Sequence, residues 1–155
     1  NIMIKYTEEE LNKILEDHKL WLNNKTTGKR ADLGGADLGG ANLYKTNLAG
    51  VDLRHANLTL VDLRHANLRH ADLRYTDLRD ANLEGANLEG ADLICADLRD
   101  ADLRHTDLSD ANLNGAELEG AYMFKAYLGH TEQGYANLSH AILSGVIFTD
   151  TRKEW

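Results

Sequence analysis

A five-residue pattern repeats 24 times between residues 31 and 150 without a change of register. The third residue of each unit is Leu in all but three units, and the first is Ala in 17 of the 24. Neither a helical period of 3.6 nor a strand period of two keeps such residues on one side of the chain. A chain that turns a corner in every unit does, and its units must stack to bury their apolar side chains. The sequence therefore predicts a solenoid.

The last residue of each unit supports this reading. It is Gly in eight units, His in six and Asp in four. These residue types enter positive φ more readily than most, as the third residue of a type II turn requires. The chain contains no Pro, so every backbone N–H is available to hydrogen-bond within the stack.

The common units ADLRH, ANLEG and ADLRD resemble the A(D/N)LXX repeats of the pentapeptide repeat family, and the resemblance covers residues 31–150. It implies an all-β solenoid, a right-handed quadrilateral β-helix of about six coils with four units in each coil. It also implies that the central Leu and the preceding small residue point inward. At ~4.8 Å per coil the rod would be roughly 29 Å long. The expected core includes Leu33, Leu53, Leu73, Leu93 and Leu113.

Residues 1–30 follow a different pattern. Thr7 followed by Glu10 forms a capping box, and apolar residues then recur at helical spacing. This pattern predicts a helix over residues 8–23, which would cover the first coil of the repeat domain at 31–150, and a connector over 24–30. The alternative is a helix that docks on another protein. Residues 151–155 would form a short tail. The apolar stripe consists of Leu11, Ile14, Leu15, His18 and Leu22.

The C-terminal units replace Asp or Asn by apolar residues in outward positions. A patch of this kind is typical of a contact surface. It predicts a homodimer through the C-terminal coils, which the resemblance also implies. The alternative is that the tail folds back and Trp155 covers the patch. The residues concerned are Tyr122, Phe124, Tyr127, Ile142 and Ile147.

The sequence offers little catalytic chemistry. It contains no phosphate-binding Gly loop, HExxH, CxxC or GxSxG motif, and a filled prism provides no dry, concave site. We therefore expect no enzyme activity, no cofactor and no metal. The best metal candidate is His130 between Asp110 and Asp150, where an exposed ion pair explains the grouping as well. Cys95 is interpreted as an incidental surface thiol. No apolar stretch predicts a membrane span or a signal peptide, so a cytoplasmic location is expected.

Charge provides the remaining functional hypothesis. Residues 31–155 carry 20 acidic and 11 basic side chains. Stacking by 20 residues would align Asp32, Asp52, Asp72 and Asp92 in one column. Such an acidic rod resembles the family members that mimic DNA, bind DNA gyrase or topoisomerase and give quinolone resistance.

Two observations weaken that analogy. B-DNA of the same length would carry roughly 17 charges, about twice the net charge of this rod. The Arg residues that stack beside the Asp column favour a surface lattice of ion pairs. The acidic balance, and Arg residues not interleaved with aromatic residues, disfavour direct nucleic-acid binding. The leading hypothesis is a structural or protein-binding module with an unidentified protein partner, no direct nucleic acid and no membrane. Gyrase-directed DNA mimicry is the alternative.

Overall fold

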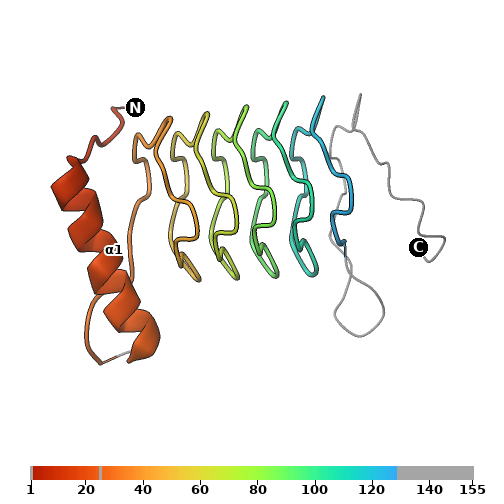
Figure 1. The fold of residues 1–155 in the computed structure, drawn as a ribbon. Helices are drawn as coiled ribbons and strands as arrows, with labels where there is room; N and C mark the ends of the chain where they lie inside the picture. Colours follow the sequence, from red (N-terminus) through yellow and green to blue (C-terminus); the bar gives the residue numbers. More distant parts are fainter. Residues whose placement is uncertain (1, 25, 129–155) are drawn as a thin grey trace.

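The computed structural model describes residues 2–24 and 26–128. It contains one helix, α1 (Glu8–Asn23), which lies against the first of a row of stacked coils (Figure 1). The N-terminus lies at the helix end of this row. The sixth coil and the tail at 151–155 fall outside the described residues.

Each coil contains 20 residues and has four sides. Parallel bridges join residues 20 positions apart, from Asp32↔Asp52 to Asp107↔Tyr127. Within a coil, the first N–H of each unit donates to the Leu carbonyl of the preceding unit, as from Ala36 to Leu33 at 3.1 Å. One turn in every five residues therefore gives four corners. We number the sides as faces by the first residues of their units: face 1 (31, 51, 71, 91, 111), face 2 (36, 56, 76, 96, 116), face 3 (41, 61, 81, 101, 121) and face 4 (46, 66, 86, 106, 126).

The pairing between coils is sparser than the name β-helix suggests. Each unit makes one isolated bridge, at its second residue, and the described residues form no continuous strand. The physical reason is the turn in every unit, which leaves only about three extended residues before the next corner. The expected all-β stack is thus built from single bridges.

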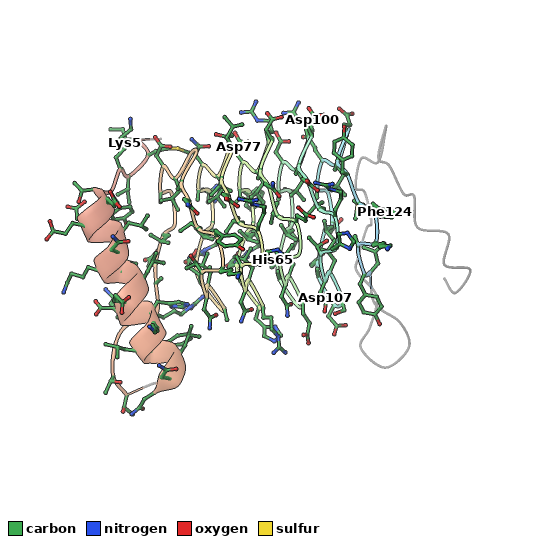
Figure 2. All side chains as sticks on the ribbon, viewed as in Figure 1. Lys5, His65, Asp77, Asp100, Asp107 and Phe124 are labelled. Atoms are coloured by element: carbon green, nitrogen blue, oxygen red, sulfur yellow. The ribbon has the colours of Figure 1, made fainter. Side chains whose placement is uncertain are left out.

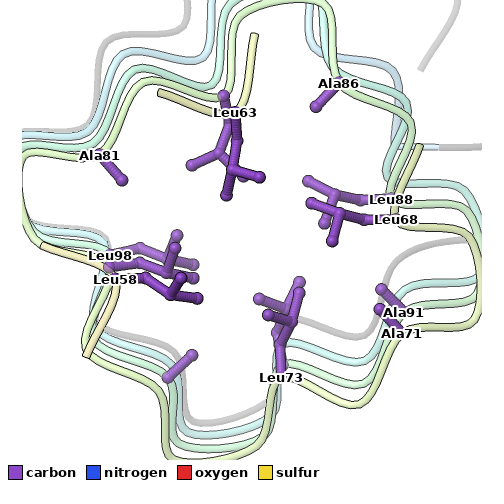
Figure 3. Packing of buried hydrophobic residues seen from close by; sticks show 14 of the residues in the cluster. Leu58, Leu63, Leu68, Ala71, Leu73, Ala81, Ala86, Leu88, Ala91 and Leu98 are labelled. Carbon is purple, nitrogen blue, oxygen red and sulfur yellow. The ribbon is translucent and has the colours of Figure 1, made fainter. Parts of the chain in front are cut away.

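Leu and Ala fill the interior. The leucines of four successive units point from four sides toward a common axis, as Leu58, Leu63, Leu68 and Leu73 do in Figure 3. All four are fully buried. The leucines singled out from the sequence are buried as well: Leu33, Leu53, Leu73, Leu93 and Leu113. No interior space is left for a ligand along the part of the axis that these residues line.

A side-chain hydrogen bond in each unit explains why the second residue is Asp or Asn. Its Oδ1 accepts the N–H of the fourth residue, as from Arg54 to Asp52 at 3.1 Å. The other four N–H groups of a unit donate to backbone carbonyls of the same or a neighbouring coil. This cap recurs in every unit from Asp32 to Asn112. Every N–H of the units over residues 51–105 is therefore used, which also accounts for the absence of Pro there.

The predicted positive φ at the end of each unit is confirmed, and it extends beyond the favoured residue types. His, Asp and Gly adopt it, and so do Lys45, Leu60 and Tyr75, with φ of 56°, 57° and 59°. Bulky residues in this region are strained. The packing of the stack therefore imposes the turn even where the local sequence opposes it.

The helix ends where the sequence predicts, and it covers the first coil. The capping box forms, with the Glu10 N–H donating to Thr7 Oγ1 at 3.1 Å. Leu11, Ile14 and Leu15 pack against the core. His18 is fully buried, and its Nδ1 accepts the N–H of Ala31 at 3.0 Å. This histidine ties the lid to the first residue of the solenoid.

A second capping element, which the sequence pattern does not predict, is an N-terminal arm formed by residues 2–6. Ile4 forms a parallel bridge with Ala36: its N–H donates to the Gly35 carbonyl at 2.9 Å, and its carbonyl accepts the Asp37 N–H at 2.7 Å. Tyr6 packs against the core beside the helix. The arm thus takes the place of a preceding coil on part of the exposed edge.

Gly28 provides a test of the lid. Its φ is +71°, and a Cβ there would collide with the carbonyl oxygen of Asp17 and lie 2.6 Å from the Trp21 nitrogen. Gly35 has φ of +66°, but a Cβ there meets nothing within 4 Å. Gly28→Ala should therefore lower the free energy of unfolding by more than Gly35→Ala, which should cost about 1 kcal/mol. Denaturant unfolding of both variants measures these free energies. Equal losses in the two variants would contradict the close packing of Gly28 against the helix.

Candidate interaction faces

The four faces carry different charge over the described residues. Face 2 has seven carboxylates and two arginines, whereas face 3 has three carboxylates and four basic residues. Face 1 has four carboxylates and two arginines. Asp77 and Asp100 of face 2 lie along one edge of the rod in Figure 2, with His65 of face 3 on the side below. Any partner therefore meets a chemically distinct surface on each side.

The predicted acidic column lies on face 1, but arginines neutralise much of it. Asp52 and Asp72 are bridged to Asp32 and Asp92 in register. Arg54 Nη2 lies 2.6 Å from Asp52 Oδ2, and Arg54 Nε lies 3.5 Å from Asp72 Oδ2. The Arg54 guanidinium hydrogen bond holds the pKa of Asp52 below its usual range, and the equivalent bond from Arg74 does the same for Asp72. The surface lattice of ion pairs proposed from the sequence is present on this face.

Face 2 is more acidic than the column singled out from the sequence. Arg79 and Arg99 clamp Asp77 and Asp97, with Nη2–Oδ2 distances of 2.6 and 2.5 Å. The hydrogen bonds from these arginines lower the pKa of both carboxyls. Three further carboxylates project from the last or fourth position of their units with no ion pair to any described residue. They are Asp80, Asp100 and Glu119.

Aromatic residues accompany the basic residues of face 3. Tyr44 and Phe124 stand in the same column as Arg64 and Arg104, so the prediction that aromatics are not interleaved with arginines is wrong here. The Arg64 guanidinium carbon lies 5.3 Å from the Tyr44 ring centroid. Because the period of 20 becomes spatial only after the chain coils, this grouping is hard to see in the linear sequence. Asp62 and Asp102 pair with the two arginines at 2.7 and 2.6 Å, which neutralises much of their positive charge.

The structure describes only part of the predicted C-terminal patch. The Tyr122 side chain is exposed, with a relative exposure of 49%, while Phe124 and Tyr127 are half-buried. The Phe124 ring packs edge-on against His105, with centroids 5.8 Å apart. Ile142 and Ile147 lie outside the described residues. Tyr122 and Tyr127 also lack the Asx acceptor of earlier units, and the last cap is at Asn112, because Glu117 already replaces Asp or Asn in the unit before Tyr122.

Other candidate chemistry is sparse over residues 2–24 and 26–128. No group of three His, Cys, Asp or Glu side chains there is arranged to hold a metal ion. His130 and Asp150 of the sequence-based metal candidate lie outside this part of the chain. Cys95 is an exposed free thiol. No helix within the same residues has the length and apolarity that a bilayer crossing needs. The outer surface of the stacked coils is not entirely smooth, because a recess of about 490 Å³ lies beside the N-terminal arm on face 1.

The clamped carboxyls predict how stability depends on pH. Asp52, Asp72, Asp77 and Asp97 have pKa values lowered in the folded state, relative to about 3.9 when unfolded. Their contribution is therefore complete above about pH 4 and is lost as pH falls through the folded pKa values. The midpoint of thermal unfolding should stay level from about pH 7 to 5 and fall below about pH 4. Arg74→Gln removes the partner of Asp72, so the midpoint of this variant should fall less steeply with pH than that of the parent. Parallel pH dependences of the two midpoints would contradict a stabilising role of the arginine–carboxylate pair.

Comparison with known proteins identifies the fold family. The family model for pentapeptide repeats matches in eight copies, over residues 29–64, 62–100 and 91–129. HetL, a pentapeptide repeat protein involved in heterocyst differentiation regulation from Nostoc sp. strain PCC 7120, is 35% identical over 79% of this chain, which spans 63% of HetL, with a TM-score of 0.34.

The pentapeptide repeat protein alr5209 of the same cyanobacterium is 30% identical, over 95% of this chain and 100% of its own, with a TM-score of 0.43. QnrB1, a plasmid-mediated fluoroquinolone resistance protein, is 18% identical over 79% of this chain and 72% of its own, with a TM-score of 0.47. A comparison with proteins of curated function found no significant match. The repeat match covers well over half of the sequence, and the chain therefore belongs to the pentapeptide repeat family.

Proposed function

We propose that this protein is a protein-binding module whose outer faces engage a partner with a basic surface. The observation that carries the proposal is the asymmetry of charge, with seven carboxylates against two arginines on face 2. The filled interior supports it, because Leu and Ala occupy the axis and leave recognition to the exterior. The proposal includes the right-handed coil and cytoplasmic location expected from the sequence. It includes no catalytic role, and the matching family model names a repeat rather than an enzyme class.

The unpaired carboxylates of face 2 make it the preferred contact surface. A carboxylate that already binds an arginine contributes little to a new ion pair. Asp80 and Asp100 have no such competitor among the described residues, and they stand one coil apart in one column. Complementary charge raises the association rate and selects the partner more than it raises affinity. A partner with basic groups about 4.8 Å apart along its surface would fit this column.

Charge reversal at two matched positions tests the proposal. Asp100 and Asp110 both end a unit, with φ of 58° and 57°, but they lie on faces 2 and 4. Lys45 and Lys125 show that Lys occupies this position in the same chain. Asp100→Lys should reduce capture of partner proteins by the immobilised chain, while Asp110→Lys, with the same net charge, should leave it unchanged. Equal capture by both variants and the parent would reject face 2 as the contact.

DNA mimicry remains the second candidate, and the acidity of face 2 is the observation that favours it. Likeness to QnrB1 does not add to it, because at 18% identity the likeness concerns the fold alone. The same two variants serve as the test in a gyrase supercoiling assay. Mimicry predicts inhibition by the parent that weakens with Asp100→Lys. Reversing Asp52 or Asp72 is a poorer test, because those carboxylates anchor Arg54 and Arg74. Absence of inhibition by the parent would remove this candidate.

We also propose that the C-terminal coils form a homodimer. The support is the replacement of Asp and Asn by Tyr122 and Tyr127, with Tyr122 exposed, since exposed aromatic side chains are enriched at interfaces. Light scattering should give twice the mass of one chain. A combined Tyr122→Ser and Tyr127→Ser variant should give the mass of one chain. Tyr44→Ser, an exposed aromatic residue in the first coil, is the control and should leave the dimer intact. A parent that scatters as a monomer would exclude the dimer.

A further inference from the structure

The ion-pair lattice of face 1 has the same arrangement in the second and third coils. Arg54 Nη2 lies 2.6 Å from Asp52 Oδ2, and its Nε is 3.5 Å from Asp72 Oδ2. One coil later, Arg74 Nη2 lies 2.6 Å from Asp72 Oδ2, and its Nε is 3.6 Å from Asp92 Oδ2. Each guanidinium is therefore held by the carboxylate of its own coil and by that of the next coil.

One coil earlier, the two carboxylates are present but the arginine is not. Asp32 and Asp52 are bridged in the same register, and the residue two positions after Asp32 is Gly34. A Cβ on Gly34 would lie 3.3 Å from Asp32 Oδ1 and 3.7 Å from Asp52 Oδ1. Both carboxylates thus flank the path that a longer side chain would take. Asp32 accepts the Gly34 N–H at 3.1 Å and forms no ion pair with a described residue.

On the adjacent face of the first coil, the carboxylate equivalent to Asp32 does have hydrogen-bonding and charged partners. On face 2, Gly39 stands in the position equivalent to Gly34. There Asp37 accepts Asn57 Nδ2 at 2.8 Å, and Lys5 Nζ from the N-terminal arm lies 3.7 Å away. On face 1, Arg30 is close in sequence, but its Nε donates to the Gly50 carbonyl at 2.5 Å. Asp32 therefore lacks the cation that Asp37 receives.

Open space lies over the same position. The recess of about 490 Å³ is lined by Asp32 and Asp52, by Arg54, by Met3 of the arm, and by His55 and Tyr75 of the next two coils. The His55 and Tyr75 rings stack with centroids 5.0 Å apart and an interplanar angle of 4°. This wall suits the flat face of a guanidinium and the alkyl chain that carries it.

We propose that this recess binds the guanidinium of an arginine side chain from a partner polypeptide, in the position relative to Asp32 and Asp52 that Arg54 takes relative to Asp52 and Asp72. The inference rests on the proposed binding role and names the chemistry of one contact. Arginine is specified over lysine because the planar guanidinium matches two carboxylates through paired hydrogen bonds. A polypeptide is specified over a free guanidino compound because exposed Ile2 and Met3 offer apolar contact beside the recess.

Titration of the intact chain, followed by the amide resonances of Gly34, Gly35 and Arg54, tests this inference. The probe is the acetylated, amidated peptide Leu-Arg-Leu. We expect saturable shifts at these amides, and about threefold or more weaker binding of the matching Leu-Lys-Leu peptide. Gly34→Arg supplies a guanidinium from the chain itself and should abolish the response. Gly39→Arg is the matched control on face 2 and should preserve it. Asp32→Asn should weaken binding while the other amides keep their native positions.

Three outcomes would overturn the inference. The first is the absence of a saturable shift in the parent, and the second is an undiminished shift in Gly34→Arg. The third is binding of agmatine as tight as that of the peptide, which would point to a free guanidino compound. A thermal melt of Gly34→Arg adds a readout without ligand: its midpoint should rise above that of Gly39→Arg, and an equal or lower midpoint counts against the site. Absence of a peptide response in the parent, together with normal Asp100-dependent capture, would reject the recess and leave the binding role intact.

Discussion

The repeat from Asp32 to Asn112 depends on the hydrogen bond between the second side chain of each unit and the N–H of the fourth residue. A turn in every five residues removes that N–H from any ladder between coils, and an unpaired backbone donor is costly. Asp and Asn supply the acceptor, as Asp52 does for Arg54 at 3.1 Å. With this cap in place the chain can turn four times in 20 residues and still bring Leu and Ala to the axis.

The same residue connects the fold to its surface chemistry. The Oδ1 atom of Asp72 caps the backbone, while its Oδ2 atom receives Arg74 at 2.6 Å. An Asn at that position would keep the cap and lose the ion pair. The choice between Asp and Asn therefore sets the charge of each face without changing the fold. A stack built this way can vary its faces independently, which suits a binding module.

Capping the first coil uses three separate devices. The helix covers the apolar interior, the His18 imidazole accepts the first N–H of the solenoid, and the arm bridges Ala36 through Ile4. Lys5 at the end of the arm reaches Asp37, so face 2 is closed at this end. Among residues 2–24 and 26–128, no equivalent residue forms an ion pair with Asp32 on face 1. The recess beside the arm is the result of this unequal capping.

The sequence by itself determined the five-residue turn, the inward Leu and Ala, and the helix at Glu8–Asn23, because each is encoded by residues close together in the chain. The expectation of 20 residues in each coil came from the resemblance to the family. Which residues the coils bring together was decided by the tertiary structure. Tyr44 joins Arg64 on one face, and Gly34 leaves Asp32 without the arginine that stands at this position in the second and third coils. The arm at Ile4 was missed because one bridge leaves no periodic signal. Contacts between residues 20 or more positions apart exist only after the chain has closed its coils.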